Sequence, residues 1–474
     1  MLIIDDGIST AQWLSSLATF IGAFYRKFPH VEVRGLLSHM VKKISEGSVV
    51  ELCVLQSLLK TAGGYGFADC SSIASLSQLQ LEGRCGSLEL RRETSDFGVI
   101  EKFDLGSSSK LRSALQSTNN FGTIFLILLS QIRYKLFNVK MSKIKLIGNA
   151  LDMCQRTIFL LLTFITESFE EELNYDDSLV AKYAMSLPSP RDLFLLYGLE
   201  PVEIWTLHRP IFRVALSATC ATSLLCSSNL AMIESMVSDY YNDVMTPTLY
   251  HVFFVLSIYD ITYPEERYTL ELNRLNREID RLTKLQKGGK EAQATISAMN
   301  QAAAAAGVTG RDLRDASLFT KTHEQDLMRL KKSVDKLTVD MIRQKVHYEK
   351  IHGFLLQDKR NLFADTDQGA HACKAMRSYI SECISPRCRL SPDNAIFCSK
   401  FSSLLHDIET PNFYLLFFYE SLIESLERII YGLTEDEASN FAIFFQDSWT
   451  SINEYRFDAK LYESSLQGKV GLLS

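Results

Sequence analysis

Five potential metal ligands lie close together near the carboxyl end of the chain: His371, Cys373, Cys383, Cys388 and Cys398. Structural zinc sites usually combine two close pairs of ligands. Only Cys383 and Cys388, with four residues between them, approach that spacing. Cys398 falls within a predicted amphipathic helix, and free cysteine is among the most buried residue types. We therefore reject Cys383, Cys388 and Cys398 as metal ligands and expect packing residues; a zinc-containing helical interaction module is the alternative.

No other group of residues forms a recognisable catalytic motif. The glycines at 63–66 and 83–86 lack the Gly-x4-Gly-Lys-Ser/Thr sequence of a phosphate-binding loop. The acidic residues at 170–172 and 176–177 are typical of a solvated helix end and loop. No serine or cysteine lies in a known nucleophile motif. We predict no enzymatic activity, no catalytic residue and no cofactor.

Basic residues cluster on one predicted helix and are the candidate contacts for a partner or RNA: Lys331, Lys332, Lys336, Arg343 and Lys345. Lysines and arginines gathered on one element can bind RNA phosphates or an acidic protein. Aromatic residues that could stack on bases are scarce in this stretch. A solvated coiled-coil face is the interpretation that we favour for this pattern, and RNA contact is expected to be indirect or weak.

Helical patterns dominate the elements that must position these residues. Four Ser-Pro or Thr-Pro pairs predict helix starts, because the hydroxyl can cap free backbone N–H groups and proline suits the first helical position. They are Ser189-Pro190, Thr246-Pro247, Ser391-Pro392 and Thr410-Pro411. Thr434 and Glu437 have the spacing of a capping box. Short helices with one apolar face must pack on neighbours, so we predict an all-α fold, an irregular α-helical solenoid or bundle.

Heptad spacing predicts a coiled coil over residues 265–360. The apolar residues are Tyr268, Leu272, Leu275, Ile279 and Leu282, then Leu327, Leu330, Val334, Leu337 and Met341, then Tyr348, Ile351 and Leu355. A Gly/Ala-rich linker at 288–310 separates the two runs. We therefore expect a projecting antiparallel hairpin whose first helix spans about three heptads. This segment has 19 Lys and Arg against 14 Asp and Glu, a net charge of +5, whereas the rest of the chain carries −11.

The predicted organisation has four parts. Residues 1–190 form an N-terminal helical region with an irregular connection at 61–110, and a second break is expected at 171–190. Residues 191–264 form another helical region, 265–360 the coiled-coil arm, and 361–474 a C-terminal helical region.

Composition is that of a soluble, folded protein of 474 residues, with 46% hydrophobic and 22% charged residues. The net charge of −6 argues against a generally basic nucleic-acid binder. The apolar runs near 121–129 and 158–165 are shorter than the roughly 18 residues of a membrane span. The acidic start of the chain does not have the charge of a signal peptide. We expect the ten cysteines to stay reduced in the cytosol or nucleus.

Several short segments resemble the THO complex subunit 2 family, in order along most of the chain. The C-terminal ones are Pro386-Arg387-Cys388, the Ala395/Cys398/Phe401 helix, Thr410-Pro411-Asn412-Phe413 and the Leu-Thr-Glu-Asp-Glu-Ala-Ser segment at 433–439. Upstream ones are 33–37, 55–63, Gly98, 111–115, Arg209-Pro210 and 247–268. The Gly/Ala-rich linker replaces a lysine-rich tract of the family. The chain is also shorter than family members, so we expect it to correspond to their latter helical part, as an incomplete gene model or a reduced relative.

The resemblance implies a non-enzymatic scaffold of the nuclear THO/TREX assembly, which couples transcription and mRNP assembly to mRNA export. The implied partners are other THO complex subunits and the DEAD-box RNA helicase of mRNA export, with no membrane contact. A generic coiled-coil adaptor is a further alternative.

Overall fold

The structure is a computed structural model, and it describes residues 8–28, 30–48, 50–61, 85–86, 90, 105–116, 120–138, 144–171, 177–217, 245–304, 312–364 and 370–466. Helices make up nearly all of these ranges, and one isolated bridge pairs Met245 with Phe363. The all-α prediction is confirmed. In the same ranges, no helix has both the length and the apolar character needed to cross a membrane.

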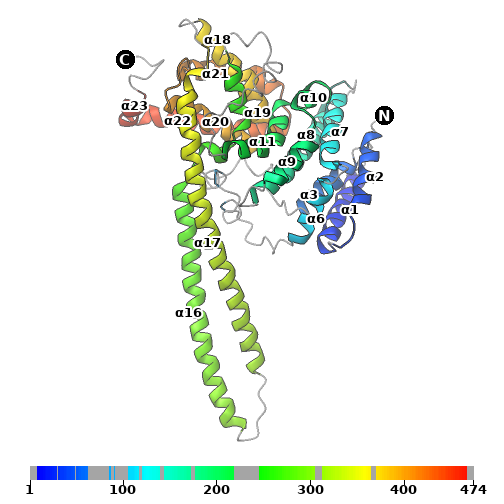
Figure 1. Cartoon of the computed structure of the whole chain (residues 1–474), viewed down its shortest axis with the longest axis vertical. Helices are drawn as coiled ribbons and strands as arrows, with labels where there is room; N and C mark the ends of the chain where they lie inside the picture. The colour runs from blue at the N-terminus through cyan, green and yellow to red at the C-terminus, as the bar shows by residue number, and fades with distance from the viewer. Residues whose placement is uncertain are drawn as a thin grey trace. The chain divides into compact units, whose positions relative to one another are not determined.

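The chain divides into two compact units (Figure 1). The body unit comprises Met1–Leu76, Phe97–Ile261 and Ile351–Ser474, and the hairpin unit comprises Ser77–Asp96 and Thr262–Lys350. The body helices before the hairpin are α1 (Ile8–Lys27), α2 (Arg34–Ser45), α3 (Val50–Thr61), α6 (Leu105–Leu115), α7 (Phe121–Phe137), α8 (Ile144–Glu171), α9 (Asp177–Ser186), α10 (Pro190–Leu195), α11 (Pro201–Ser217), α14 (Pro247–Val255) and α15 (Ile258–Ile261). After the hairpin come a 3-10 turn (Lys359–Asn361), α18 (Ala370–Tyr379), a π-helical segment (Ile380–Ile384), α19 (Ser385–Leu390), α20 (Pro392–Asp407), α21 (Leu415–Tyr431), α22 (Glu435–Phe457) and α23 (Ala459–Ser465). The hairpin is made by α16 (Glu265–Ala304) and α17 (Asp312–Asp358).

The first half of the body unit is a stack of helices around α8. Helix α3 packs between α1 and α8, and α7 and α11 pack on other sides of α8. Gly22 allows α1 to approach α3 closely, because a Cβ atom there would lie 2.8 Å from the Ser57 carbonyl oxygen. Leu55, Leu58 and Leu161 are completely buried in this stack. Consecutive helices therefore share one apolar core, as a helical bundle or solenoid requires.

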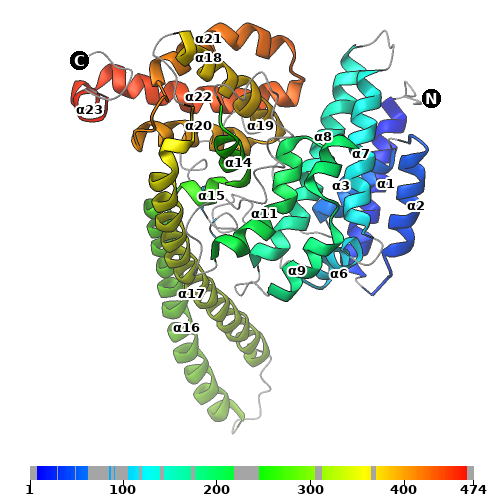
Figure 2. The same cartoon turned by 45° about the horizontal axis from the view of Figure 1, so that its top comes forward.

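An aromatic core holds the second half of the body unit together. Phe253 of α14 lies 5.4–5.6 Å, centroid to centroid, from Tyr379, Phe397 and Phe401, each ring meeting it edge to face. All four rings are fully buried. Edge-to-face aromatic pairs stabilise a core beyond the area they bury. This cluster joins α14 to α18 and α20, which are distant from it in sequence (Figure 2).

Three of the four predicted hydroxyl-proline helix starts are confirmed. The side chains of Ser189, Thr246 and Ser391 cap α10, α14 and α20. Each accepts a hydrogen bond from the backbone N–H of the residue three positions later in the chain. Thr434 and Glu437 form the predicted capping box of α22. The start at Thr410-Pro411 is wrong, because α21 begins at Leu415. There the Thr410 N–H donates to the Leu405 carbonyl, and Asn412 has a positive φ of 64°, so the dipeptide closes the end of α20 instead.

The heptad prediction is confirmed in the hairpin unit. Helices α16 and α17 run side by side (Figure 1), and Tyr268, Leu275 and Leu337 form the buried core of their seam together with Leu90. Leu272, Leu330, Val334 and Met341 pack against this core. Leu90 belongs to the predicted irregular connection, so part of that connection covers the hairpin seam.

A buried glutamine occupies the seam position between Met341 and Tyr348. The Gln344 amide nitrogen donates to the carbonyl oxygens of Cys85 at 3.0 Å and Thr262 at 2.9 Å. Its amide oxygen accepts the Tyr268 hydroxyl at 2.6 Å. A satisfied polar residue in an apolar seam specifies register, because any slip would leave it buried and unpaired.

The Gly/Ala-rich segment does not begin as a linker. Helix α16 continues through Gly288-Gly289 to Ala304, so the expectation that the first helix ends after about three heptads is wrong. Two glycines cost about 1 kcal/mol each in a helix interior, whereas alanine is the best helix former. The alanines that follow favour continuation; the remainder of the predicted linker, 305–310, lies outside the described residues.

The structure describes little of the predicted irregular segment 61–110 and contradicts part of the one at 171–190. Most of 61–110 lies outside the described residues, including the short helix expected near 76–81, and α6 begins at Leu105. The break expected at 171–190 contains α9, so that prediction is wrong for 177–186. In α9, Val180 and Tyr183 are buried, and the Tyr183 hydroxyl donates to the Leu207 carbonyl of α11 at 2.9 Å. Tertiary packing therefore fixes a helix whose sequence signal is weak.

Truncating the hairpin seam should destabilise the hairpin. Leu275→Ala removes a side chain that is 1% exposed, and we expect a loss of about 2–5 kcal/mol in the free energy of unfolding of that unit. Leu285→Ala is the matched control, because Leu285 lies on the same helix but is 45% exposed. Hydrogen exchange of α16 and α17 would measure both variants. Equal loss of protection in the two would contradict the seam.

Candidate partner-binding surfaces

The predicted basic residues of α17 do not share one side of the helix. At about 100° per residue, Lys332, Lys336 and Arg343 fall on the side opposite the seam. Lys331 lies to one side of this group, and Lys345 lies next to the seam with its ammonium 5.9 Å from the centre of the Tyr263 ring. The four lysines are exposed and Arg343 is half-buried. Three of the five can therefore face one partner at once.

Apolar side chains accompany the basic ones on the outer side of α17. Met328, Val339, Ile342 and Val346 are all exposed there. Between residues 324 and 358 no aromatic side chain is exposed, and Tyr348 is half-buried. Base stacking is a main contribution to binding of single-stranded RNA. The mixed basic and apolar character fits a protein surface better than it fits a strand of bases.

The candidate metal ligands lie inside the body. Cys383, Cys388 and Cys398 are completely buried, and Cys373 is half-buried. The Cys383 sulfur lies 3.7 Å from the Met245 sulfur. Burial raises the pKa of the Cys383 and Cys388 thiols well above the ordinary value. Across the described residues no group of three or more His, Cys, Asp or Glu side chains could hold a metal ion. The side chain of His371 lies outside the description.

Two arginines bind the carboxyl end of α14. The Arg387 guanidinium donates to the Phe253 carbonyl, to the Leu256 carbonyl at 2.7 Å and to the Asn394 side-chain oxygen at 2.9 Å. The Arg209 Nε donates to the Val255 carbonyl at 3.0 Å. The last carbonyls of a helix have no partner within it and carry partial negative charge. Arg387 and Arg209 satisfy them from α19 and α11.

Arg387 is itself enclosed by protein. It is 1% exposed, and its guanidinium carbon lies 3.4 Å from the centre of the Phe397 ring and 5.2 Å from that of Phe253. Burial lowers the pKa of Arg387 to about 9. The group is therefore a buried cation at neutral pH, held by oxygen acceptors and aromatic faces. The Pro-Arg-Cys segment thus has a structural role in the body.

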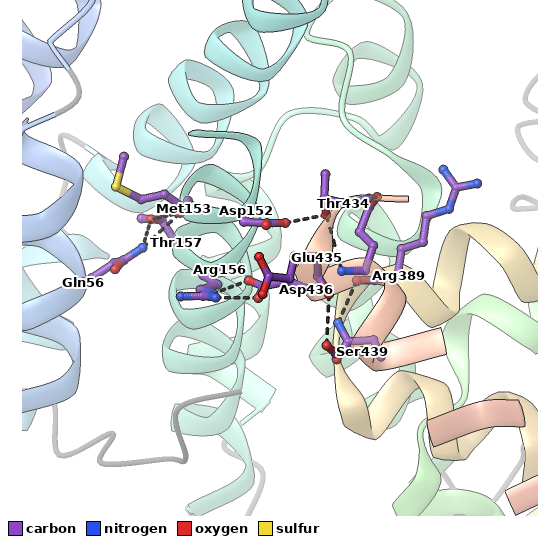
Figure 3. Close-up of polar contacts among 12 residues, drawn as sticks. Gln56, Asp152, Met153, Arg156, Thr157, Arg389, Thr434, Glu435, Asp436 and Ser439 are labelled. Carbon is purple, nitrogen blue, oxygen red and sulfur yellow. Dashed lines mark hydrogen bonds and ion pairs between the residues drawn. The ribbon is translucent and has the colours of Figure 1, made fainter. Parts of the chain in front are cut away.

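A row of polar contacts joins the two halves of the body unit (Figure 3). Arg156 of α8 makes a two-pronged ion pair with Asp436 of α22. One turn away, the Thr434 hydroxyl donates to the Asp152 carboxylate. Burial raises the pKa of Asp152, and the Thr434 hydrogen bond opposes that rise. The amino-terminal end of α22 is thus fixed against α8.

The same row continues on both sides of this joint. The Gln56 amide of α3 donates to the Thr157 hydroxyl at 2.8 Å and to the Met153 carbonyl at 3.0 Å. The Asn440 amide donates to the Arg389 carbonyl at 3.0 Å. These contacts link four helices one to the next, from α3 to α8, from α8 to α22 and from α22 to α19 (Figure 3). Segment 433–439, singled out from the sequence, is therefore a joint of the body.

The first helix exposes an aromatic stripe. Phe20 and Phe24 of α1 and Phe28, which directly follows the helix, recur every fourth residue, and Phe20 is the most exposed of them. Their ring centres are 6.4 Å and 5.1 Å apart along the stripe. Large exposed apolar patches usually mark interaction sites. Together with the outer side of α17, this stripe gives the chain more than one surface suited to protein partners.

Sequence reasoning missed several of these residues. Gln344 is polar, so it interrupts the apolar heptad pattern, although its position is that of a seam residue. The Arg209 and Arg387 contacts to α14 are long-range and have no local signal. The Asp152–Thr434 and Arg156–Asp436 contacts link residues about 280 positions apart. Of the polar contacts at the joint between α8 and α22, only the capping box of α22 was visible in the sequence.

The fold and these surfaces define a class: an all-α protein of packed helices with an antiparallel coiled-coil hairpin. Residues 242–473 match the Tho2 family, described as transcription factor/nuclear export subunit protein 2. This match covers α14 to α23, including the Arg387 site, the hairpin and the joint at α22.

Similarity to curated proteins extends over nearly the whole chain. It is 24% identical over 502 residues to THO complex subunit 2 of Arabidopsis thaliana, covering 97% of this chain and 25% of that protein. The corresponding protein of Homo sapiens is 23% identical over 486 residues, covering 99% and 28%. That of Saccharomyces cerevisiae is 22% identical over 482 residues, covering 97% and 25%. The chain is thus related to THO complex subunit 2 along its length, which confirms the resemblance, and it spans about a quarter of these relatives.

The joint between α8 and α22 should show a measurable coupling energy. In a double-mutant cycle with Arg156→Ala and Asp436→Ala, we expect a coupling energy of about 1 kcal/mol, because the ion pair is two-pronged and Asp436 is only 18% exposed. The control cycle uses Arg377 and Glu424, a pair exposed by 55% and 49%, for which a few tenths of a kcal/mol are expected. Urea unfolding would give both values. A coupling no larger than the control would mean that the pair does not hold the joint.

Proposed function

We propose that this chain is a non-enzymatic scaffold subunit of a nuclear THO/TREX assembly, which couples transcription and mRNP assembly to mRNA export. The observation that carries the proposal is the similarity to THO complex subunit 2 over 97–99% of the chain in plant, animal and yeast relatives. In this role the chain holds other THO subunits and a DEAD-box RNA helicase. The helicase hydrolyses ATP, and this chain only positions the helicase and the other subunits.

The surfaces of the structure support a scaffold role. A body of packed helices linked by buried polar contacts presents fixed faces, and extended helical proteins commonly offer several docking surfaces at once. The aromatic stripe of α1 and the outer side of α17 are two such faces. Direct RNA contact by α17 is proposed to be weak, since its charge is interleaved with aliphatic side chains.

Affinity purification of the full chain from nuclear extract tests this function. We expect recovery of THO subunits and of the DEAD-box helicase. Recovery of vesicle or cytoskeletal proteins in their place would support a generic coiled-coil adaptor and overturn the proposal. Metal analysis of the same material addresses the other alternative: a stoichiometric zinc that is lost in Cys383→Ser and Cys388→Ser would show a zinc module.

Charge reversal on α17 tests the role of its basic side. We expect Lys332→Glu with Lys336→Glu to reduce a salt-sensitive association with a THO partner or RNA roughly tenfold, because fields of this kind speed association by that order. Lys331→Glu with Lys345→Glu is the matched control, with the same change of charge on the same helix. No loss of binding in either variant would show a solvated face. Equal loss in both would show that binding depends on charge but does not use the outer side of α17. Circular dichroism would verify that α17 still folds.

A further inference from the structure

Helix α21 has two apolar sides, and the body covers only one. Leu415, Phe418 and Leu422 face the body and are buried. On the opposite side Leu416, Ile423 and Ile430 are 51%, 55% and 52% exposed. A surface helix normally has one apolar side, whereas a helix that is apolar on both sides is usually covered on both. Within the part of the chain that the structure describes, the outer side of α21 is thus an unpartnered surface.

The outer residues of α21 have the spacing of a coiled-coil seam. Leu416, Ile423 and Ile430 are seven residues apart, and Glu420 and Glu427 fall between them in a four-three pattern. Successive members of a heptad drift by only about 20° around an α-helix. The five side chains therefore form one stripe of about 21 Å along the helix axis. A second helix can lie along this stripe and contact all five.

Two carboxylates lie at the seam positions that would otherwise be apolar. Glu420 and Glu427 are exposed, and among the described residues neither has an ion-pair partner. Glu424, beside the stripe, already pairs with Arg377 at 2.6 Å. Arg428 is the only basic residue of α21, and it lies away from the stripe. A helix that covers the stripe must place positive charge opposite Glu420 and Glu427, because burying unpaired carboxylates is unfavourable.

We propose that the outer face of α21 binds an amphipathic helix of a partner protein that has aliphatic residues at every seventh position and lysine or arginine between them. The carboxylates disfavour RNA and anionic lipid, whose phosphates they would repel. They also disfavour pairing with α21 of a second copy, which would bring like charges together. The inference goes beyond the proposed function, because it holds for any assembly that contains this chain.

The first test uses a designed peptide as the probe. A labelled helical peptide with leucine at each seventh position and lysine at the intermediate seam positions is titrated with the full chain and followed by fluorescence anisotropy. A second peptide carries glutamate in place of lysine. We expect the lysine peptide to bind at least tenfold more tightly than the glutamate peptide. Equal binding of both would overturn the proposal, since it would show only nonspecific apolar contact.

Substitutions on α21 locate the site. We expect Ile423→Ser to weaken the lysine peptide at least tenfold, and Glu420→Lys with Glu427→Lys to reverse the preference toward the glutamate peptide. Because all three side chains are exposed, these changes should leave the body folded. Glu454→Lys with Glu463→Lys is the matched control, with the same charge change at exposed sites on α22 and α23. A preference that the α21 variants do not change would place the binding elsewhere and overturn the proposal.

The second test asks what covers the face in the native assembly. A photo-crosslinking amino acid at Ile423 is incorporated into the full chain in cells, and the crosslinked peptide is identified by mass spectrometry. We expect a helical segment of another protein with basic residues at heptad spacing. Crosslinks to a second copy of this chain, together with a dimer seen by light scattering, would overturn the proposal. Crosslinks to an acidic segment of another protein would overturn it as well. The peptide test uses no THO component, so its failure leaves the proposed THO function unaffected.

Discussion

The body of this protein depends on a cation buried at the end of a short helix. Helix α14 is nine residues long, and its last carbonyls would be left without partners among apolar side chains. Arg387 and Arg209 satisfy the carbonyls of residues 253, 255 and 256. Removing an arginine from water is unfavourable by several kcal/mol. Each of the three guanidinium nitrogens of Arg387 donates to an acceptor, and the Phe397 and Phe253 rings pack on the group, which offsets this cost. Arg387 therefore links α14, α19 and α20, and Arg209 links α11 to the same end of α14.

The same constraint accounts for the residues that surround the arginine in the sequence. Pro386 lies where the π-helical segment Ile380–Ile384 passes into α19, and its missing N–H interrupts the helical hydrogen-bond ladder at that point. Cys388 and Cys398 lie near the guanidinium and are completely buried, as small apolar residues. Asn394 uses its side chain twice, because its amide donates to the capping Ser391 hydroxyl and its oxygen accepts from Arg387. The segment that first suggests metal chemistry is thus shaped by packing around one charge.

Local features were predictable from the sequence, and long-range polar contacts were not. Helix caps at Ser189, Thr246, Ser391 and Thr434 depend on residues within three positions, so their signals are short and readable. Thr410-Pro411 has the same local signal but closes a turn, because Asn412 binds the Ala364 carbonyl and fixes the chain there. Gln344 was missed because its partners, Cys85, Thr262 and Tyr268, come from other segments. The heptads predicted the hairpin but not where α16 ends. The low helix propensity of the glycines around Gly288 is balanced by the high helix propensity of the alanines that follow.

The central claim is that Arg387 holds the body together, and its removal is the most direct test. The free energy of unfolding should be measured by urea titration for the natural chain, for Arg387→Met and for the exposed control Arg428→Met. Methionine keeps similar apolar volume but leaves the carbonyls of 253 and 256 and the Asn394 oxygen unpaired. We expect a loss of about 3 kcal/mol or more for Arg387→Met, with faster hydrogen exchange in α14 and α19, and a change within about 0.5 kcal/mol for Arg428→Met. An Arg387→Met variant as stable and as protected as the natural chain would contradict the account.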